Sequence, residues 1–210
     1  MAPVEGVLMN TMDDDCSQSI EVAVIGSGWA GAVTEVETFC THIVRRALED
    51  LPEEVRARVE LGIRLDADEA VRALNARWRG KDRATNVLSF PGLDPHEDWP
   101  ASGPVLLGDI VIAFETVSRE AFAAGIGVDA HLAHMLVHGV LHLCGHDHVE
   151  ESDAGRMEAR ERAILAGLGY ADPYADSEPV AWADSEPVAQ AGSEPVARAG
   201  SETVARAGSA

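Results

Sequence analysis

The sequence predicts an α/β fold, and three observations support this class. Four short segments have the apolar composition or the alternation of β-strands. Longer segments between and after them carry apolar residues three or four positions apart, which is the spacing of one helix face. The chain has 210 residues, which is enough for one domain with a sizeable core.

Strands are predicted where short apolar segments alternate with polar or small residues, or are bounded by turn residues. They cover residues 20–25, 59–65, 85–90 and 106–113. Pro91 ends the third strand. The fourth strand is apolar except for one carboxylate, Asp109. This carboxylate either caps or pairs structurally or lines a functional site, and the sequence leaves both possibilities open.

Helices are predicted from the apolar stripes. They cover residues 33–51, 68–78, 114–124, 129–144 and 151–168. Residues 26–31 form a turn before the first helix, and Pro52 ends that helix. An aspartate is expected to cap the second helix, either Asp66 or Asp68, and Asp129 is expected to cap the fourth.

The fourth predicted helix and the turn after it contain three histidines at the spacing of metal ligands. His138 and His142 are four residues apart and therefore share one helix face, with Cβ atoms about 5–6 Å apart. Gly145 can adopt a positive φ, end the helix and return His148 toward the same ion. Three imidazoles without a fourth protein ligand describe a catalytic zinc site with one open position. The same helix carries two further histidines, His131 and His134, in its first turns.

Two alternatives concern the residues beside these histidines. The spacing HxxxHxxGxxH also occurs in metzincin proteases, where a glutamate after the first histidine acts as general base. Here Gly139 takes that position, which argues against a protease. Cys144 is a conceivable fourth ligand, but a small buried apolar role is favoured because it lies on another side of the helix.

The net charge of −20 excludes a protein that binds nucleic acid through a broad basic surface. Any RNA contact must therefore depend on the metal and on a local basic cluster. The densest cluster consists of Arg77, Arg79, Lys81 and Arg83. It lies at a helix-to-strand turn, where functional loops concentrate. The simpler explanation is a solvated surface on which Arg79 pairs with a nearby acid such as Asp82.

Outside the predicted domain of residues 20–175, the sequence changes character. Residues 1–19 are polar and acidic and are expected to be a flexible extension. Residues 176–210 repeat an eight-residue unit that is too poor in apolar bulk to form a core, which predicts a disordered tail. No secretory signal or transmembrane segment is expected. Three cysteines without CxxC spacing favour a reducing compartment, so we expect a cytoplasmic protein with no membrane partner.

Three motifs together resemble the YbeY family of bacterial endoribonucleases. They are the histidine segment, residues 79–82 with the sequence RGKD followed by TNVLSFP over 85–91, and LGDIVI over 107–112. The likeness covers about residues 20–174 and includes the closing Leu-Gly-Tyr over 168–170. It implies one α/β (α+β) domain with a small mixed four-stranded sheet flanked by helices, and a zinc site on one helix and the following turn. His146 and Ala84 depart from the family's common residues.

The resemblance also implies an activity and residue roles. The expected protein is a zinc-dependent, single-strand-specific endoribonuclease that processes the 3′ end of 16S ribosomal RNA and acts in ribosome maturation and quality control. One Zn²⁺ per chain is expected on His138, His142 and His148, with Arg79 as the functional arginine. The partners would be ribosomal RNA precursor and the small ribosomal subunit.

The chemistry of this sequence is compatible with that activity. Phosphodiester cleavage builds negative charge that a guanidinium can bind in a bidentate manner. Lys81 and Arg83 are candidate substrate-binding residues, and Asp147 is a candidate substrate contact or general base. A non-catalytic ribosome assembly factor with structural zinc, and a metalloprotease, are the alternatives.

Overall fold

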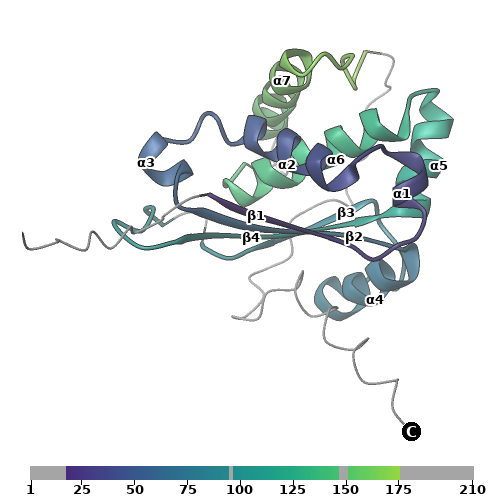
Figure 1. Cartoon of the computed structure of the whole chain (residues 1–210), viewed down its shortest axis with the longest axis horizontal. Coiled ribbons are helices and arrows are strands. Elements are labelled where there is room, and N and C mark those ends of the chain that lie inside the picture. The colour runs from purple at the N-terminus through teal and green to yellow at the C-terminus, as the bar shows by residue number, and fades with distance from the viewer. Residues whose placement is uncertain (1–17, 95–96, 147–150, 176–210) are drawn as a thin grey trace, which may run out of the picture.

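The computed structural model describes residues 18–94, 97–146 and 151–175. One four-stranded sheet lies at its centre (Figure 1). Most helices cover one face of this sheet, and a single helix, α4, covers part of the other face within the described residues. The predicted tail lies outside the described residues, and so does the N-terminal extension except for its last two positions.

The sheet confirms the predicted class and the four predicted strands. The strands are β1 (Ser19–Val24), β2 (Val59–Asp66), β3 (Val87–Pro91) and β4 (Val105–Ala113). Their spatial order is β1-β2-β4-β3. β1, β2 and β4 are parallel, whereas β3 pairs with β4 in the antiparallel sense, so the sheet is mixed.

The described residues contain two short helices that the sequence did not predict. The helices are α1 (Trp29–Ala32), α2 (Val36–Ala47), α3 (Glu53–Arg56), α4 (Asp68–Arg79), α5 (Phe114–Ala124), α6 (Val128–Leu143) and α7 (Glu151–Gly167). α1 replaces part of the predicted turn over 26–31, because the fully buried Trp29 anchors it and donates a hydrogen bond to the carbonyl of Asp66 at 3.2 Å. Pro52 precedes α3 and does not end α2, which finishes at Ala47.

The predicted aspartate caps are wrong, because these carboxylates have other partners or make no capping bond. α4 and α6 begin after Ala67 and Gly127, without a side-chain cap. Asp68 instead accepts hydrogen bonds from the backbone N–H and hydroxyl of Thr116, both at 2.9 Å. Glu115 in turn accepts the backbone N–H of Asp68 at 2.7 Å. The first turns of α4 and α5 therefore cap each other across 47 residues of sequence.

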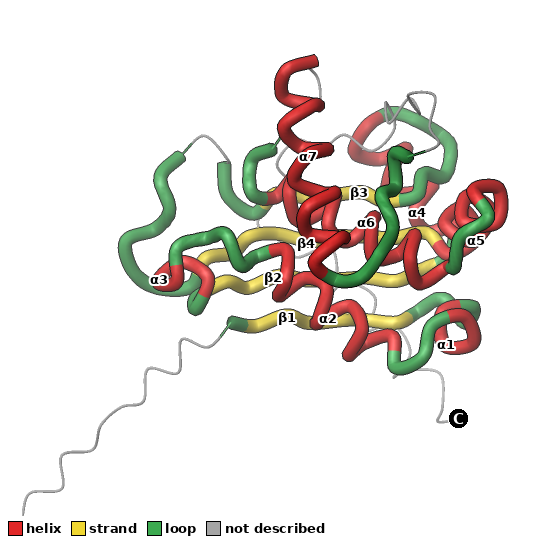
Figure 2. Tube along the Cα trace, turned by 90° about the horizontal axis from the view of Figure 1, so that it is seen from above, coloured by secondary structure: helices red, strands yellow, loops and turns green. Residues whose placement is uncertain are grey.

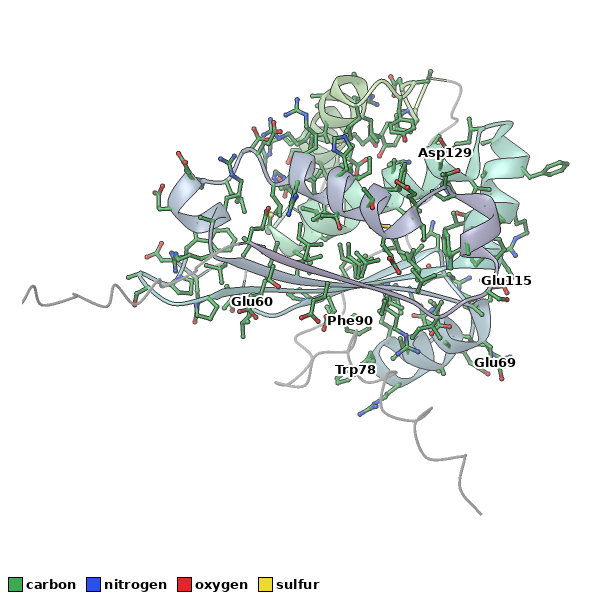
Figure 3. All side chains as sticks on the ribbon, viewed as in Figure 1. Glu60, Glu69, Trp78, Phe90, Glu115 and Asp129 are labelled. Carbon is green, nitrogen blue, oxygen red and sulfur yellow. The ribbon has the colours of Figure 1, made fainter. Side chains whose placement is uncertain are left out.

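The two faces of the sheet bury separate apolar clusters. The larger cluster joins the sheet to α2, α6 and α7. The smaller cluster lies under α4 and consists of Val71, Leu88, Phe90, Val111 and Ala113, with Leu74 and Trp78 packed against it. Trp78 and Phe90 meet edge to face at 6.2 Å on this side (Figure 3). No helix within the described residues is long and apolar enough to cross a membrane.

Candidate metal centre

The central helix of the larger layer is α6, which lies over β3 and β4 and is flanked by α2, α5 and α7 (Figure 2). Nearly all of its residues are buried, and its apolar residues Leu132, Met135, Leu136, Val140 and Leu143 lie in the core. This explains why both predicted ligands on α6, His138 and His142, have exposed fractions of only 3% and 1%.

Gly139 allows α6 to lie close to the sheet. A Cβ atom built at this position would lie 3.0 Å from Cδ1 of Ile110 and 3.2 Å from Oγ of Ser89, which is tight for both neighbours. The Ser89 hydroxyl also donates to the Gly139 carbonyl at 3.4 Å. A glutamate at this position would be directed into the sheet. The packing is therefore a second argument against the protease alternative, in addition to the absence of a glutamate from the sequence at this position.

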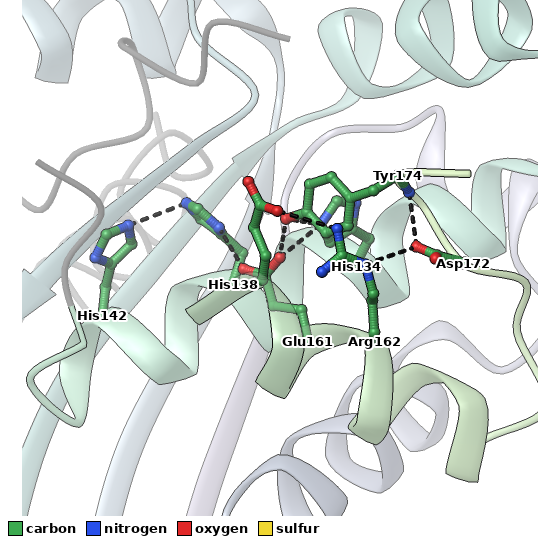
Figure 4. Close-up of polar contacts among 8 residues, drawn as sticks. His134, His138, His142, Glu161, Arg162, Asp172 and Tyr174 are labelled. Atoms are coloured by element: carbon green, nitrogen blue, oxygen red, sulfur yellow. Dashed lines mark hydrogen bonds and ion pairs between the residues drawn. The ribbon is translucent and has the colours of Figure 1, made fainter. Parts of the chain in front are cut away.

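The two predicted ligands point their ring nitrogens at each other. The ring centroids of His138 and His142 are 4.5 Å apart, and their Nε2 atoms are separated by 3.0 Å. Figure 4 shows this pair at one end of a row of polar contacts along α6. The i,i+4 spacing therefore brings the two imidazoles together as the sequence predicts.

The other ring nitrogen of each histidine faces an acceptor. Nδ1 of His138 lies 2.7 Å from Oε1 of Glu161, and Nδ1 of His142 lies 3.0 Å from the backbone carbonyl of His146. An ionised carboxylate and a carbonyl can only accept, so each Nδ1 carries the proton. The two Nε2 lone pairs consequently face each other, which suits a shared cation between them and is unfavourable without a positive charge. The donor set of His138 and His142 thus fits a metal ion.

The helix ends before a glycine with the predicted positive φ. Gly145 has φ 89°, and the N–H of His146 donates to the carbonyl of Leu141 at 3.0 Å. Cys144 is partly buried and packs against the core, and burial raises the pKa of its thiol to about 12. This supports the apolar role for Cys144.

The remaining predicted ligand, His148, and Asp147 lie outside the described residues. Within residues 18–94, 97–146 and 151–175, no group of three or more histidine, cysteine or acidic side chains is arranged to bind a metal. The structure therefore brings together two of the three predicted ligands, and the position of the third stays a prediction.

A buried glutamate from another helix completes this region. Glu161 of α7 is 1% exposed, and its Oε2 contacts Nε2 of His134 at 3.2 Å and the Tyr174 hydroxyl. Burial alone would raise the pKa of Glu161, but the hydrogen bonds from His134 and His138 outweigh it and hold that pKa well below its ordinary value. Burial lowers the pKa of His134, so this ring is neutral and donates to the carboxylate.

Sequence reasoning missed Glu161, although a signal was present. The residue stands in the apolar stripe of α7, four positions after Met157 and three before Ile164, which are both buried. A carboxylate at a core position of a helix is buried only when it is paired. That pattern points to a functional or structural partner on the facing helix.

The helix that begins the basic cluster lies on the other face of the sheet from the helix of the histidine pair. Arg79 is in the last turn of α4, on the opposite face of the sheet from α6, and Lys81 and Arg83 follow it (Figure 1). The buried amide of Asn75 donates to the carbonyl of Arg83 at 2.8 Å and thereby ties this loop to α4. Asp109 is 8% exposed and lies on β4, where it pairs with Phe90 of β3.

Comparisons with known proteins agree with the motif analysis. A family model described as Endoribonuclease YbeY matches residues 31–169. The chain is 47% identical over 161 residues to the Endoribonuclease YbeY of Rhodopseudomonas palustris strain BisA53, covering 75% of this chain and 91% of that protein. It is 44% identical over 165 residues to the Rhizobium meliloti protein of the same name, covering 76% and 96%.

Among solved structures, the chain is similar to the solution structure of TM1509 from Thermotoga maritima. The TM-score is 0.48 and the identity 23%, over 76% of this chain and 97% of that one. The family model spans well over half of the sequence, and the curated relatives are matched over most of their length. The chain belongs to the YbeY endoribonuclease family.

Proposed function

We propose that this chain is a zinc-dependent, single-strand-specific endoribonuclease that matures the 3′ end of 16S ribosomal RNA. One observation carries the metal part of this proposal, namely the 3.0 Å approach of the Nε2 atoms of His138 and His142 with both Nδ1 atoms bonded to acceptors. Family membership supports the nuclease part. The RNA substrate, the small ribosomal subunit as partner and the role in ribosome quality control follow from the resemblance.

In this proposal His138, His142 and His148 hold the ion. When bound, zinc supplies Lewis acidity toward a phosphate oxygen and toward water. The protein side chains supply the remaining functions. Glu161 and the His146 carbonyl orient the two described imidazoles, and the buried walls of α6 and β3 limit access of bulk water to this side of the pair.

Arg79 is proposed to bind the scissile phosphate through its planar guanidinium, with Lys81 and Arg83 binding the neighbouring backbone. Because α4 and α6 lie on opposite faces of the sheet, an RNA strand in contact with both has to pass around an edge of the sheet. A single strand is flexible enough to follow such an edge, whereas a stiff duplex is not, which supports the proposed preference for single strands. Asp147 is a candidate general base.

The deciding experiment measures metal content and RNA cleavage on the same sample. The protein is stripped with a chelator and reloaded with zinc, and single-stranded and duplex RNA are offered separately. We expect cleavage of the single strand that disappears on stripping and returns with one zinc per chain. A zinc-loaded protein without cleavage would favour the assembly-factor alternative, and cleavage unchanged by complete stripping would refute the metal requirement.

A further inference from the structure

The carboxylate of Glu161 contacts both His138 of the histidine pair and the segment that follows α7. Oε1 of Glu161 accepts from Nδ1 of His138 at 2.7 Å, and Oε2 faces His134 and the Tyr174 hydroxyl. These three donors come from α6 and from the segment after α7, so two separate parts of the chain converge on one carboxylate (Figure 4).

Tyr174 belongs to residues 172–174, which we call the C-terminal clasp. Contacts within the clasp and with α7 hold its side chain. The backbone N–H of Tyr174 donates to Oδ1 of Asp172 at 2.9 Å, and Nε of Arg162 donates to the same oxygen at 3.2 Å. The Arg162 guanidinium lies 4.6 Å from the centre of the Tyr174 ring, and that ring meets His134 edge to face at 5.5 Å. The clasp thus packs against α7, and the Tyr174 hydroxyl points at Glu161.

The consequence for His138 follows from its tautomer. An imidazole hydrogen-bonded through Nδ1 to a carboxylate keeps its proton on Nδ1, and its Nε2 lone pair points away from that carboxylate. In this structure the lone pair points at His142. Loss of Glu161, or movement of its carboxylate, would let the His138 ring rotate or change tautomer.

We propose that Glu161 is a positioning residue for His138, and that the C-terminal clasp holds Glu161 in place through the Tyr174 hydroxyl, so that a segment remote from the ligands sets the metal affinity. This inference rests on the metal site of the proposed function but not on RNA cleavage. Partners of metal-bound histidines typically change metal affinity by about 10–100-fold when removed.

The test measures zinc affinity of the full-length protein by competition with a chromophoric chelator. Glu161→Gln keeps the size of the side chain and should weaken zinc binding by about 10–100-fold. Tyr174→Phe removes only the hydroxyl and should weaken it in the same direction by a smaller factor. Glu161→Asp keeps the charge on a shorter side chain and should recover part of the loss.

The chain provides matched controls. Asp153→Asn removes another carboxylate of α7, which pairs with Arg156 and not with Arg162. Tyr170→Phe removes the hydroxyl of the other tyrosine in the sequence. Both controls should bind zinc like the wild type.

A second readout separates positioning from general folding. Nitrogen-15 NMR of the metal-free protein should show His138 protonated on Nδ1 in the wild type and a mixture of tautomers in Glu161→Gln. If Glu161→Gln does not fold, Tyr174→Phe decides, because it leaves the buried carboxylate in place.

Each outcome has a defined meaning. Wild-type zinc affinity in folded Glu161→Gln or in folded Tyr174→Phe would overturn the proposal, and so would an equal loss in the two controls. Zinc binding that depends on Glu161 and Tyr174 in a protein without RNA cleavage would support this inference while refuting the proposed function. A wild-type protein that binds no zinc would refute both.

Discussion

The carboxylate of Asp82 receives two hydrogen bonds from the guanidinium of Arg72, at 2.7 and 2.9 Å. These bonds hold the pKa of Asp82 below its ordinary value. The simpler explanation of the basic cluster named Asp82 as a possible partner of Arg79. In the structure, Asp82 forms its ion pair with Arg72. Asp82 is therefore the partner of Arg72, and the role of Arg79 as a phosphate-binding residue is tested by substitution.

Arg79→Ala should reduce single-turnover RNA cleavage by about 10²–10³-fold, the scale for loss of one charge-stabilising donor. Zinc content and fold should be unchanged, since Arg79 is neither a predicted ligand nor part of either apolar cluster. Arg79→Lys should restore only part of the rate, because an ammonium retains the charge without the planar fork.

The matched control for Arg79 is Arg77→Ala. Arg77 is exposed on the same helix end and lies 5.0 Å from the centre of the Trp78 ring. Arg77→Ala should reduce RNA cleavage much less than Arg79→Ala does. Undiminished cleavage by zinc-loaded Arg79→Ala would exclude the catalytic role.

His142→Ala should remove most of the bound zinc, because it takes away one of the two imidazoles that meet at 3.0 Å. Metal analysis of the purified variant measures this directly. His42→Ala, which changes an exposed histidine of α2, serves as the control. A wild-type metal content in His142→Ala would refute the assignment.

A chain that ends at Tyr174 should keep the thermal midpoint and zinc affinity of the full-length protein, since the eight-residue repeats after it are too poor in apolar residues to build a core. A chain that ends at Asp172 should instead lose zinc affinity, because it lacks the Tyr174 hydroxyl that contacts Glu161. Thermal melts and chelator competition on the two chains provide the comparison. A large loss of thermal midpoint or zinc affinity in the chain that ends at Tyr174 would show that residues after 174 stabilise the domain.

Asp68→Ala should lower the free energy of unfolding by about 0.5–2 kcal/mol, the usual cost of removing a helix cap. The reason is that Asp68 caps α5 through Thr116 rather than its own helix. Urea denaturation measures the change. Glu69→Ala, at an exposed acidic position of the same first turn, should cost less. Equal costs would indicate that the interhelical cap contributes nothing measurable.

The sequence predicted elements best where a single face is buried. The first seven residues of β2 alternate between buried and half-buried, and the predicted helix over 114–124 matches α5, which ends before Gly125 with φ 67°. The contact between His138 and His142 on α6 was predicted equally well, because helical spacing alone determines which side chains meet.

Contacts between elements distant in the sequence could not be predicted in this way. The aspartate caps were wrong because Asp68 bonds to a helix that begins 46 positions later in the chain. Glu161 was missed because its partner His138 lies 23 residues away on another helix. Local propensity indicates that a polar residue needs a partner, but only the packing of α7 against α6 determines which one.

The place of the C-terminal clasp in the sequence has a consequence for synthesis of the protein. Translation produces all four strands first, then both histidines of the pair, and Glu161 and Tyr174 only afterwards. If Tyr174 holds Glu161 as proposed, a chain released before residue 174 carries the sheet and the ligands without the hydroxyl that fixes their orientation. Such shortened products would bind zinc more weakly, so that full zinc affinity is acquired only after residue 174 has been added to the chain.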